Sequence, residues 1–70
     1  MIDLNMDIYE LGLSKRSLYA LNKNGIITVK DLVRYNCYTL SKLKGVGDKV
    51  ISDIVSTLKR HNYHLGNKNL

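Results

Sequence analysis

The residues of this 70-residue chain that are best suited to chemistry form a short glycine turn, Gly45-Val46-Gly47, followed by Lys49. The two glycines let the backbone turn sharply and approach a ligand closely, because no Cβ intervenes. An apolar pattern with helical spacing follows at once, so we expect a helix to begin here with its free N–H groups facing the turn. This combination predicts a phosphate-binding turn, and the repeated phosphates of a nucleic-acid backbone suit it best.

The charge of the protein favours the same class of partner. The formal net charge is +5, and the first ten residues hold three of the six acidic residues and no basic one. The remaining residues therefore carry a net charge of +8, which promotes association with a polyanion. A lysine-rich surface that only keeps the protein soluble accounts for the charge equally well.

Apolar spacing and capping residues predict four helices joined by short connections. With the expected N-cap in parentheses, they are Lys15–Lys23 (Ser14), Val29–Tyr35 (Thr28, with Asp31 in a capping box), Leu40–Lys44 (Thr39) and about Asp48–His61 (the glycine turn). The residues expected to face inward are Leu18, Leu21, Ile26, Ile27, Val29, Leu32, Val33, Leu40, Leu43, Val50, Ile51, Ile54, Val55 and Leu58. Residues 1–10 are expected to form an N-terminal arm, residues 11–66 a helical domain and residues 67–70 a tail.

An internal repeat links the glycine turn to an earlier part of the sequence. With an offset of 33 residues, Gly12–Leu18 falls on Gly45–Ile51, which makes Arg16 equivalent to Lys49. If the repeat is real, two helix N-termini, each with a base, grip neighbouring phosphates. Chance is the alternative explanation, since any capped amphipathic helix gives a similar pattern.

Other kinds of chemistry have less support. Cys37 is the only cysteine, which excludes a disulfide within the protein and suits a reducing compartment. His61 and His64 are three residues apart, but no ligand set completes a metal site, and no nucleophile motif, carboxylate pair or nucleotide loop is present. We therefore expect no catalytic residue, metal or cofactor. The sequence has no apolar run long enough to span a membrane and no signal-peptide character, so we expect a cytoplasmic or nuclear protein without a membrane partner.

The stretch Leu40–Ile54 resembles a helix-hairpin-helix motif, which binds DNA backbone through hairpin amides. A wider match resembles the C-terminal domain of the bacterial RNA polymerase alpha subunit. It covers about residues 8–66 and rests on Glu10–Ser17, Gly25–Val33, Leu40–Lys49 and Tyr63–Gly66. The resemblance implies an all-α, compact domain of four to five helices that binds the minor groove of AT-rich double-stranded promoter DNA weakly. It also implies contacts with RNA polymerase, sigma factor or a transcription activator.

The same resemblance implies which residues contact DNA. Arg16 falls on the family's principal DNA-contacting arginine, Gly47 on its hairpin glycine and Lys49 on the following lysine. The sequence departs from the family at four positions: Tyr19 replaces an asparagine, Asp48 a base, Val50 a serine and Asp53 a longer acidic residue, which indicates a divergent member. The expected DNA-binding residues are Arg16, Gly45, Gly47, Lys49, Lys15, Tyr19, Lys44 and Asp53.

Two other functions remain open. The first is a protein-interaction module that contacts RNA polymerase, sigma factor or a regulator without strong DNA binding. Its surface would use the five tyrosines, Tyr9, Tyr19, Tyr35, Tyr38 and Tyr63, which serve equally well to complete the core. The second is a DNA-binding appendage of an enzyme such as a repair nuclease.

Overall fold

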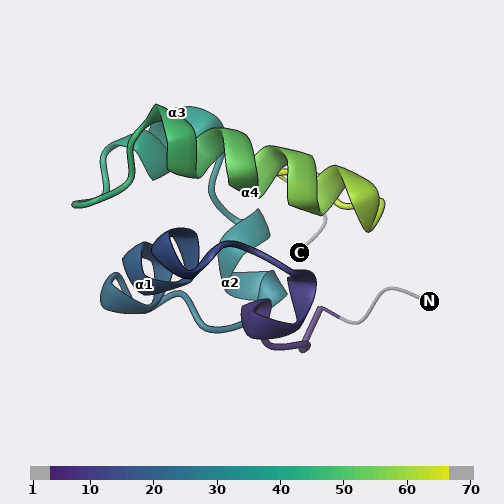
Figure 1. Ribbon diagram of the computed structural model, residues 1–70. Coiled ribbons are helices and arrows are strands. Elements are labelled where there is room, and N and C mark those ends of the chain that lie inside the picture. The colour runs from purple at the N-terminus through teal and green to yellow at the C-terminus, as the bar shows by residue number, and fades with distance from the viewer. Residues whose placement is uncertain (1–3, 67–70) are drawn as a thin grey trace.

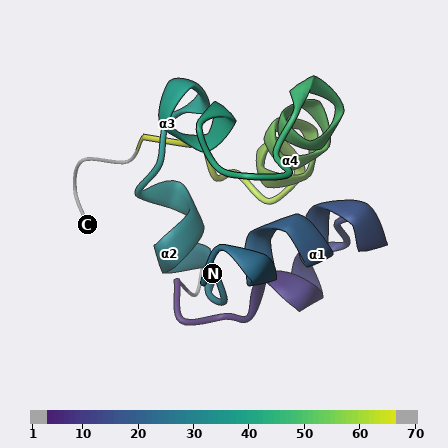
Figure 2. The same ribbon diagram turned by 90° about the vertical axis from the view of Figure 1, so that its left-hand side faces the viewer.

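The computed structural model describes residues 4–66 of the protein. These residues form a 3₁₀-helix and four α-helices: η1 (Ile8–Leu11), α1 (Lys15–Lys23), α2 (Val29–Val33), α3 (Cys37–Ser41) and α4 (Asp48–Arg60). In both views of the ribbon, α3 lies beside α4 in one layer, and α1 and α2 form a second layer beneath them (Figures 1 and 2). The prediction of an all-α domain of four to five helices is confirmed.

Local capping explains where α1 and α2 begin. The backbone N–H of Ser17 donates to the Ser14 hydroxyl (3.2 Å), so α1 has the N-cap and the bounds that the sequence predicts. At α2, Thr28 and Asp31 form the predicted capping box, in which each side chain accepts from the backbone N–H of the other residue. The helix ends at Val33, two residues before the predicted end.

The predicted position of α3 is wrong by three residues. The helix spans Cys37–Ser41 rather than Leu40–Lys44, and its N-cap is Asn36 rather than Thr39. The Asn36 side chain accepts from the Thr39 N–H (2.8 Å), and the Thr39 hydroxyl accepts from the Asn36 N–H (2.9 Å). Thr39 is therefore the third helical residue of a capping box, and the stronger capping residue sets the start.

The longest helix, α4, supplies the centre of the core. It ends at Arg60, one residue before the predicted end, and Val50, Ile54 and Leu58 are buried as expected. Val55 is 41% exposed, whereas Thr57 is fully buried. A repeat of 3.6 residues places Thr57 on the same face as Val50 and Ile54 and leaves Val55 at the edge, so the predicted apolar stripe is wrong at this position.

The segment before α1 packs against the start of α2. Backbone N–H groups of Val29 and Lys30 donate to the carbonyls of Met6 (2.9 Å) and Leu4 (2.8 Å), and Ile8 is fully buried. Ile26 is buried as predicted in the α1–α2 connection, but Ile27 is 45% exposed, contrary to the prediction of a buried pair.

The division of the protein into arm, domain and tail stays a prediction, and residues 67–70 lie outside the described residues. Among residues 4–66, no helix combines the length and the apolar character that crossing a bilayer requires.

Candidate nucleic-acid interface

The start of α1 and the glycine turn before α4 lie on one surface. Figure 1 shows α1 and the α3–α4 turn at the same end of the molecule, and this end faces the viewer in Figure 2. Two adjoining hollows share Arg16 and Gly45 in their linings. The first is also lined by Lys15, Tyr19, Ala20, Lys23 and Lys44, and the second by Gly47, Asp48, Lys49 and Val50. The fold therefore brings together seven of the eight residues predicted to bind DNA; the eighth, Asp53, lines neither hollow.

The glycine turn is anchored at its centre and open at its sides. Val46 is buried, and its N–H donates to the Leu43 carbonyl (3.2 Å). Gly45 has a φ of +85°, a left-handed conformation that favours glycine. A Cβ on Gly47 would meet no atom within 4 Å, so a ligand can approach the backbone closely at this residue.

The N-terminus of α4 differs from those of the other α-helices in its capping. Gly47 is its N-cap and provides no side-chain hydrogen bond, whereas side chains cap the first turns of α1, α2 and α3. The first N–H groups of α4 therefore remain available to an acceptor beside Lys49. Asp48, also in the first turn, suits the helix dipole but repels a phosphate.

Asp53 joins α4 to the start of α1. One oxygen of its carboxylate, Oδ2, accepts from the Ser17 hydroxyl (2.7 Å) and from the Ser14 backbone N–H (3.1 Å). Partial burial raises the pKa of Asp53, but hydrogen bonds from Ser17, Ser14 and Thr57 outweigh it, so the pKa lies below its ordinary value. The ionised carboxylate thus holds the N-terminal turn that carries Arg16 against α4.

A second link joins the end of α1 to the turn. The Asn24 side-chain amide donates to the carbonyls of Ala20 (2.8 Å) and Lys44 (3.0 Å). Ala20 also faces Gly45, where a Cβ would stand 4.0 Å from the Ala20 Cβ. The position of the glycine turn relative to α1 is therefore set by Asn24 at one end of the helix and by Asp53 at the other.

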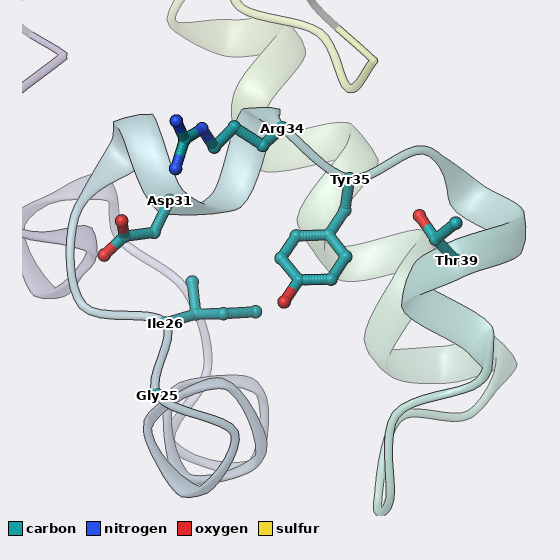
Figure 3. A pocket seen from close by; sticks show the side chains of 6 residues that line it. All are labelled: Gly25, Ile26, Asp31, Arg34, Tyr35 and Thr39. Carbon is teal, nitrogen blue, oxygen red and sulfur yellow. The ribbon is translucent and has the colours of Figure 1, made fainter.

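A separate polar hollow lies between the α1–α2 connection and α3 (Figure 3). Tyr35 lies between Ile26 and Thr39 in this view. The Asp31 carboxylate accepts from backbone N–H groups of Thr28 and Ile27, which lower its pKa, and the Thr39 hydroxyl accepts from the Asn36 N–H in the capping box of α3. Two of the polar side chains that line this hollow, those of Asp31 and Thr39, therefore belong to helix capping boxes.

The two histidines at the end of α4 make separate contacts. His61 Nε2 lies 3.0 Å from the Leu11 carbonyl oxygen and connects α4 to η1, whereas His64 Nδ1 lies 3.4 Å from the carbonyl oxygen of Leu65. No group of three potential metal ligands from histidine, cysteine, aspartate and glutamate occurs within residues 4–66.

Comparison with known proteins identifies the family to which this sequence and fold belong. The family profile of the C-terminal domain of the bacterial RNA polymerase alpha subunit matches residues 1–60. The protein belongs to this family. It is 33% identical over 63 residues to the DNA-directed RNA polymerase subunit alpha of Thermus aquaticus, and 36% identical over 63 residues to that of Aquifex aeolicus. Both matches cover 90% of this sequence and 20% of the relative, so the sequence spans a fifth of the length of these subunits.

A solved structure of the family has the same fold. The NMR structure of the alpha C-terminal domain from Helicobacter pylori superposes with a TM-score of 0.82 at 32% identity, and the match covers 94% of this protein and 58% of that one. The resemblance inferred from the sequence is confirmed. The alpha C-terminal domain is a non-catalytic module of transcription, in agreement with the expectation that this domain is not an enzyme.

Three residues that the sequence did not reveal contribute to this surface: Lys23 lines it, and Ser17 and Asn24 hold its parts together. Lys23 lines the hollow of Arg16, and its ammonium lies 5.7 Å from the ring centroid of Tyr19. Its i+4 spacing from Tyr19 was the signal that could have revealed it. The interhelix roles of Ser17 and Asn24 had no such signal, because their partners lie 36 and 20 residues away.

Proposed function

We propose that this protein is a DNA-binding module of transcription that contacts the minor groove and backbone of AT-rich promoter DNA. The observation that carries the proposal is the shared surface of Arg16 and the glycine turn, where two adjoining hollows hold five basic residues between them. Membership in the alpha C-terminal domain family supports it. The sequence resemblance implies that three of the proposed contacts, Arg16, Gly47 and Lys49, fall on positions at which the family contacts DNA.

Each residue predicted to bind DNA has a role in the proposed complex. Arg16 enters the narrow minor groove, whose negative potential is enhanced in A-tracts. The backbone N–H groups near Gly45 and Gly47 and the ammonium of Lys49 hold phosphates. Lys15 and Lys44 add long-range attraction. Tyr19 flanks Arg16 in the hollow, and Asp53 acts through the Ser14–Ser17 turn that it holds in place.

The small number of phosphate contacts sets the expected affinity. Binding by the isolated protein should be weak, with a Kd of about 10⁻⁴–10⁻⁶ M and a steep dependence on salt. We propose that association with RNA polymerase, sigma factor or a transcription activator raises the effective concentration of the domain at its site. This function places the protein in the cytoplasm, at the nucleoid.

The test is a titration of backbone amide shifts with AT-rich and GC-rich duplexes of equal length. We expect shifts around Arg16 and at Gly45–Lys49 that are larger with AT-rich DNA and lost in Arg16→Ala. Arg34→Ala is the matched control, because Arg34 is also exposed but lines the separate hollow of α2. A folded protein that shows no shifts with either duplex at low salt contradicts the proposal.

A second candidate function is docking to another protein, and one feature favours it. A hollow of about 520 Å³ lies beside the C-terminal half of α4 and is lined largely by apolar side chains, among them the exposed Val55, the partly exposed Leu65 and the buried Tyr63. Amide shifts around Val55 with RNA polymerase, in the absence of shifts with DNA, would favour this function over the first.

A further inference from the structure

Tyr19 places an exposed aromatic ring in the middle of a basic hollow. Its side chain is 69% exposed on α1, three residues after Arg16. The hollow of about 470 Å³ that it lines is also lined by the side chains of Lys15, Arg16, Lys23 and Lys44, and its lining includes no acidic residue. An aromatic ring surrounded by cations is the arrangement with which proteins bind a base and its flanking phosphates.

The other exposed tyrosines lack these surroundings. Tyr9 is 74% exposed and precedes Glu10 in η1. Tyr38 is 68% exposed on α3 and has the Lys42 ammonium 4.8 Å from its ring centroid, but it does not line the basic hollow. Exposure and a nearby lysine are therefore common to Tyr19 and Tyr38, and the cluster of four cations distinguishes Tyr19.

The geometry of DNA decides which ligand can use this ring. In an intact duplex the faces of the bases are stacked, and the minor groove presents only base edges. An unpaired nucleotide exposes the face of its base, which can stack on an aromatic side chain, and its two phosphates can pair with lysines. The Lys23 ammonium lies 5.7 Å from the centroid of the Tyr19 ring, and the side chain remains largely exposed, so a base can reach the ring.

We propose that the basic hollow around Tyr19 binds an unpaired nucleotide of a DNA strand, with its base stacked on the Tyr19 ring and its phosphates paired with Lys23 and Lys44. The proposal rests on the proposed DNA binding and extends it, because Arg16 lies on the boundary between this hollow and the one at the glycine turn. Duplex DNA at Arg16 and the turn would then continue into an unpaired nucleotide at Tyr19.

The test compares three fluorescently labelled DNAs by anisotropy at one fixed low salt concentration. They are an AT-rich duplex, the same duplex with one unpaired thymine, and an oligo-dT strand. We expect the wild-type protein to bind the duplex with the unpaired thymine more tightly than the intact one. Tyr19→Leu should weaken binding to both DNAs with unpaired bases by about 5- to 150-fold, the loss expected for one stacked base, and should weaken binding to the intact duplex by a clearly smaller factor.

Two further variants separate stacking from other effects. Tyr19→Phe keeps the ring and should bind like the wild type, and Tyr38→Leu removes a ring of equal exposure and should have no effect. Urea unfolding of each variant establishes that the fold is retained.

Equal loss in Tyr19→Leu and Tyr38→Leu, or no preference of the wild type for the unpaired thymine, overturns the stacking proposal and leaves the proposed function standing. Absence of binding to all three DNAs by the folded wild-type protein overturns both.

Discussion

Replacing Asp53 by asparagine tests whether a single carboxylate holds the start of α1 against α4. In the wild-type protein, Asp53 Oδ2 accepts from the Ser17 hydroxyl at 2.7 Å and from the Ser14 N–H at 3.1 Å. Asparagine has nearly the same shape, but its amide is neutral and keeps a single carbonyl oxygen as acceptor. The substitution therefore removes the charge with little change in packing.

The structure sets the size of the expected effect. A hydrogen bond to a charged group contributes about 1.5–3 kcal/mol, and a neutral one about 1 kcal/mol. Asp53 is partly exposed, which brings the charged bonds toward the low end of that range. We therefore expect Asp53→Asn to lower the free energy of unfolding by about 1–2 kcal/mol at neutral pH.

Urea unfolding at a series of pH values measures this effect and its origin. The folded-state pKa of Asp53 is lowered, so the charge stabilises the fold fully above the unfolded-state pKa of about 3.9. That stabilisation is lost as the pH falls through the lower folded-state pKa. The difference between wild type and Asp53→Asn should thus be constant from neutral pH to about pH 5 and shrink at lower pH.

Glu10→Gln is the control for this experiment, because it removes an equal charge from an exposed position in η1. It should change the free energy of unfolding by less than about 0.5 kcal/mol at neutral pH. A difference between wild type and Asp53→Asn that stays the same at every pH at which both proteins are folded would refute the role assigned to the charge.

Two further predictions concern the glycine turn. Gly45→Ala should lower the free energy of unfolding by about 1–2 kcal/mol because φ at Gly45 is +85°. Gly47→Ala should change it by less than about 0.5 kcal/mol, because the poorer N-cap is offset by the lower entropy of the unfolded chain, and should weaken duplex binding. Urea unfolding and anisotropy measure the two effects. Equal stability losses in the two variants would contradict the assignment of strain to Gly45. Asn24→Ala should lower the free energy of unfolding by about 1–2 kcal/mol through its two lost hydrogen bonds and weaken duplex binding. Asn22→Ala, at an exposed position in the last turn of α1, is its control, and equal effects of the two substitutions would show that the link to Lys44 has no importance.

Local signals in the sequence were enough to predict most of the fold. Ser14 and Thr28 each cap a helix with a hydrogen bond that spans three residues, so a short stretch of sequence contains both partners. The start of α3 was missed although its capping box is equally local, because Asn36 and Thr39 are both good capping residues and only one can be the N-cap. The burial of Thr57 was missed because the inward face of α4 was predicted from apolar residues alone, and threonine carries a hydroxyl.

Most residues of the candidate surface, though not Lys23, could be named from the sequence, whereas the contacts that bring them together could not. The residues of the turn and the start of α1 carry their own signals in glycine, lysine and arginine. The contacts that set their relative position join Asp53 to Ser17 across 36 residues and Asn24 to Lys44 across 20. No local sequence pattern indicates such pairs, because an aspartate or asparagine that makes a distant contact cannot be told in the sequence from one that makes none. The roles of the individual residues in DNA binding stay predictions.

The uncapped N-terminus of α4 has a consequence for protein engineering. Glycine at an N-cap costs only a few tenths of a kcal/mol relative to serine or asparagine, so this helix gives up little stability by leaving its first N–H groups open. A stabilisation programme that adds helix caps would choose Gly47 early, because α4 is the longest helix and Gly47 provides no capping hydrogen bond. Replacing Gly47 by serine or asparagine would give the open N–H groups a permanent acceptor within the protein. The variant would gain stability at a position where the proposed function depends on backbone N–H groups without an internal acceptor.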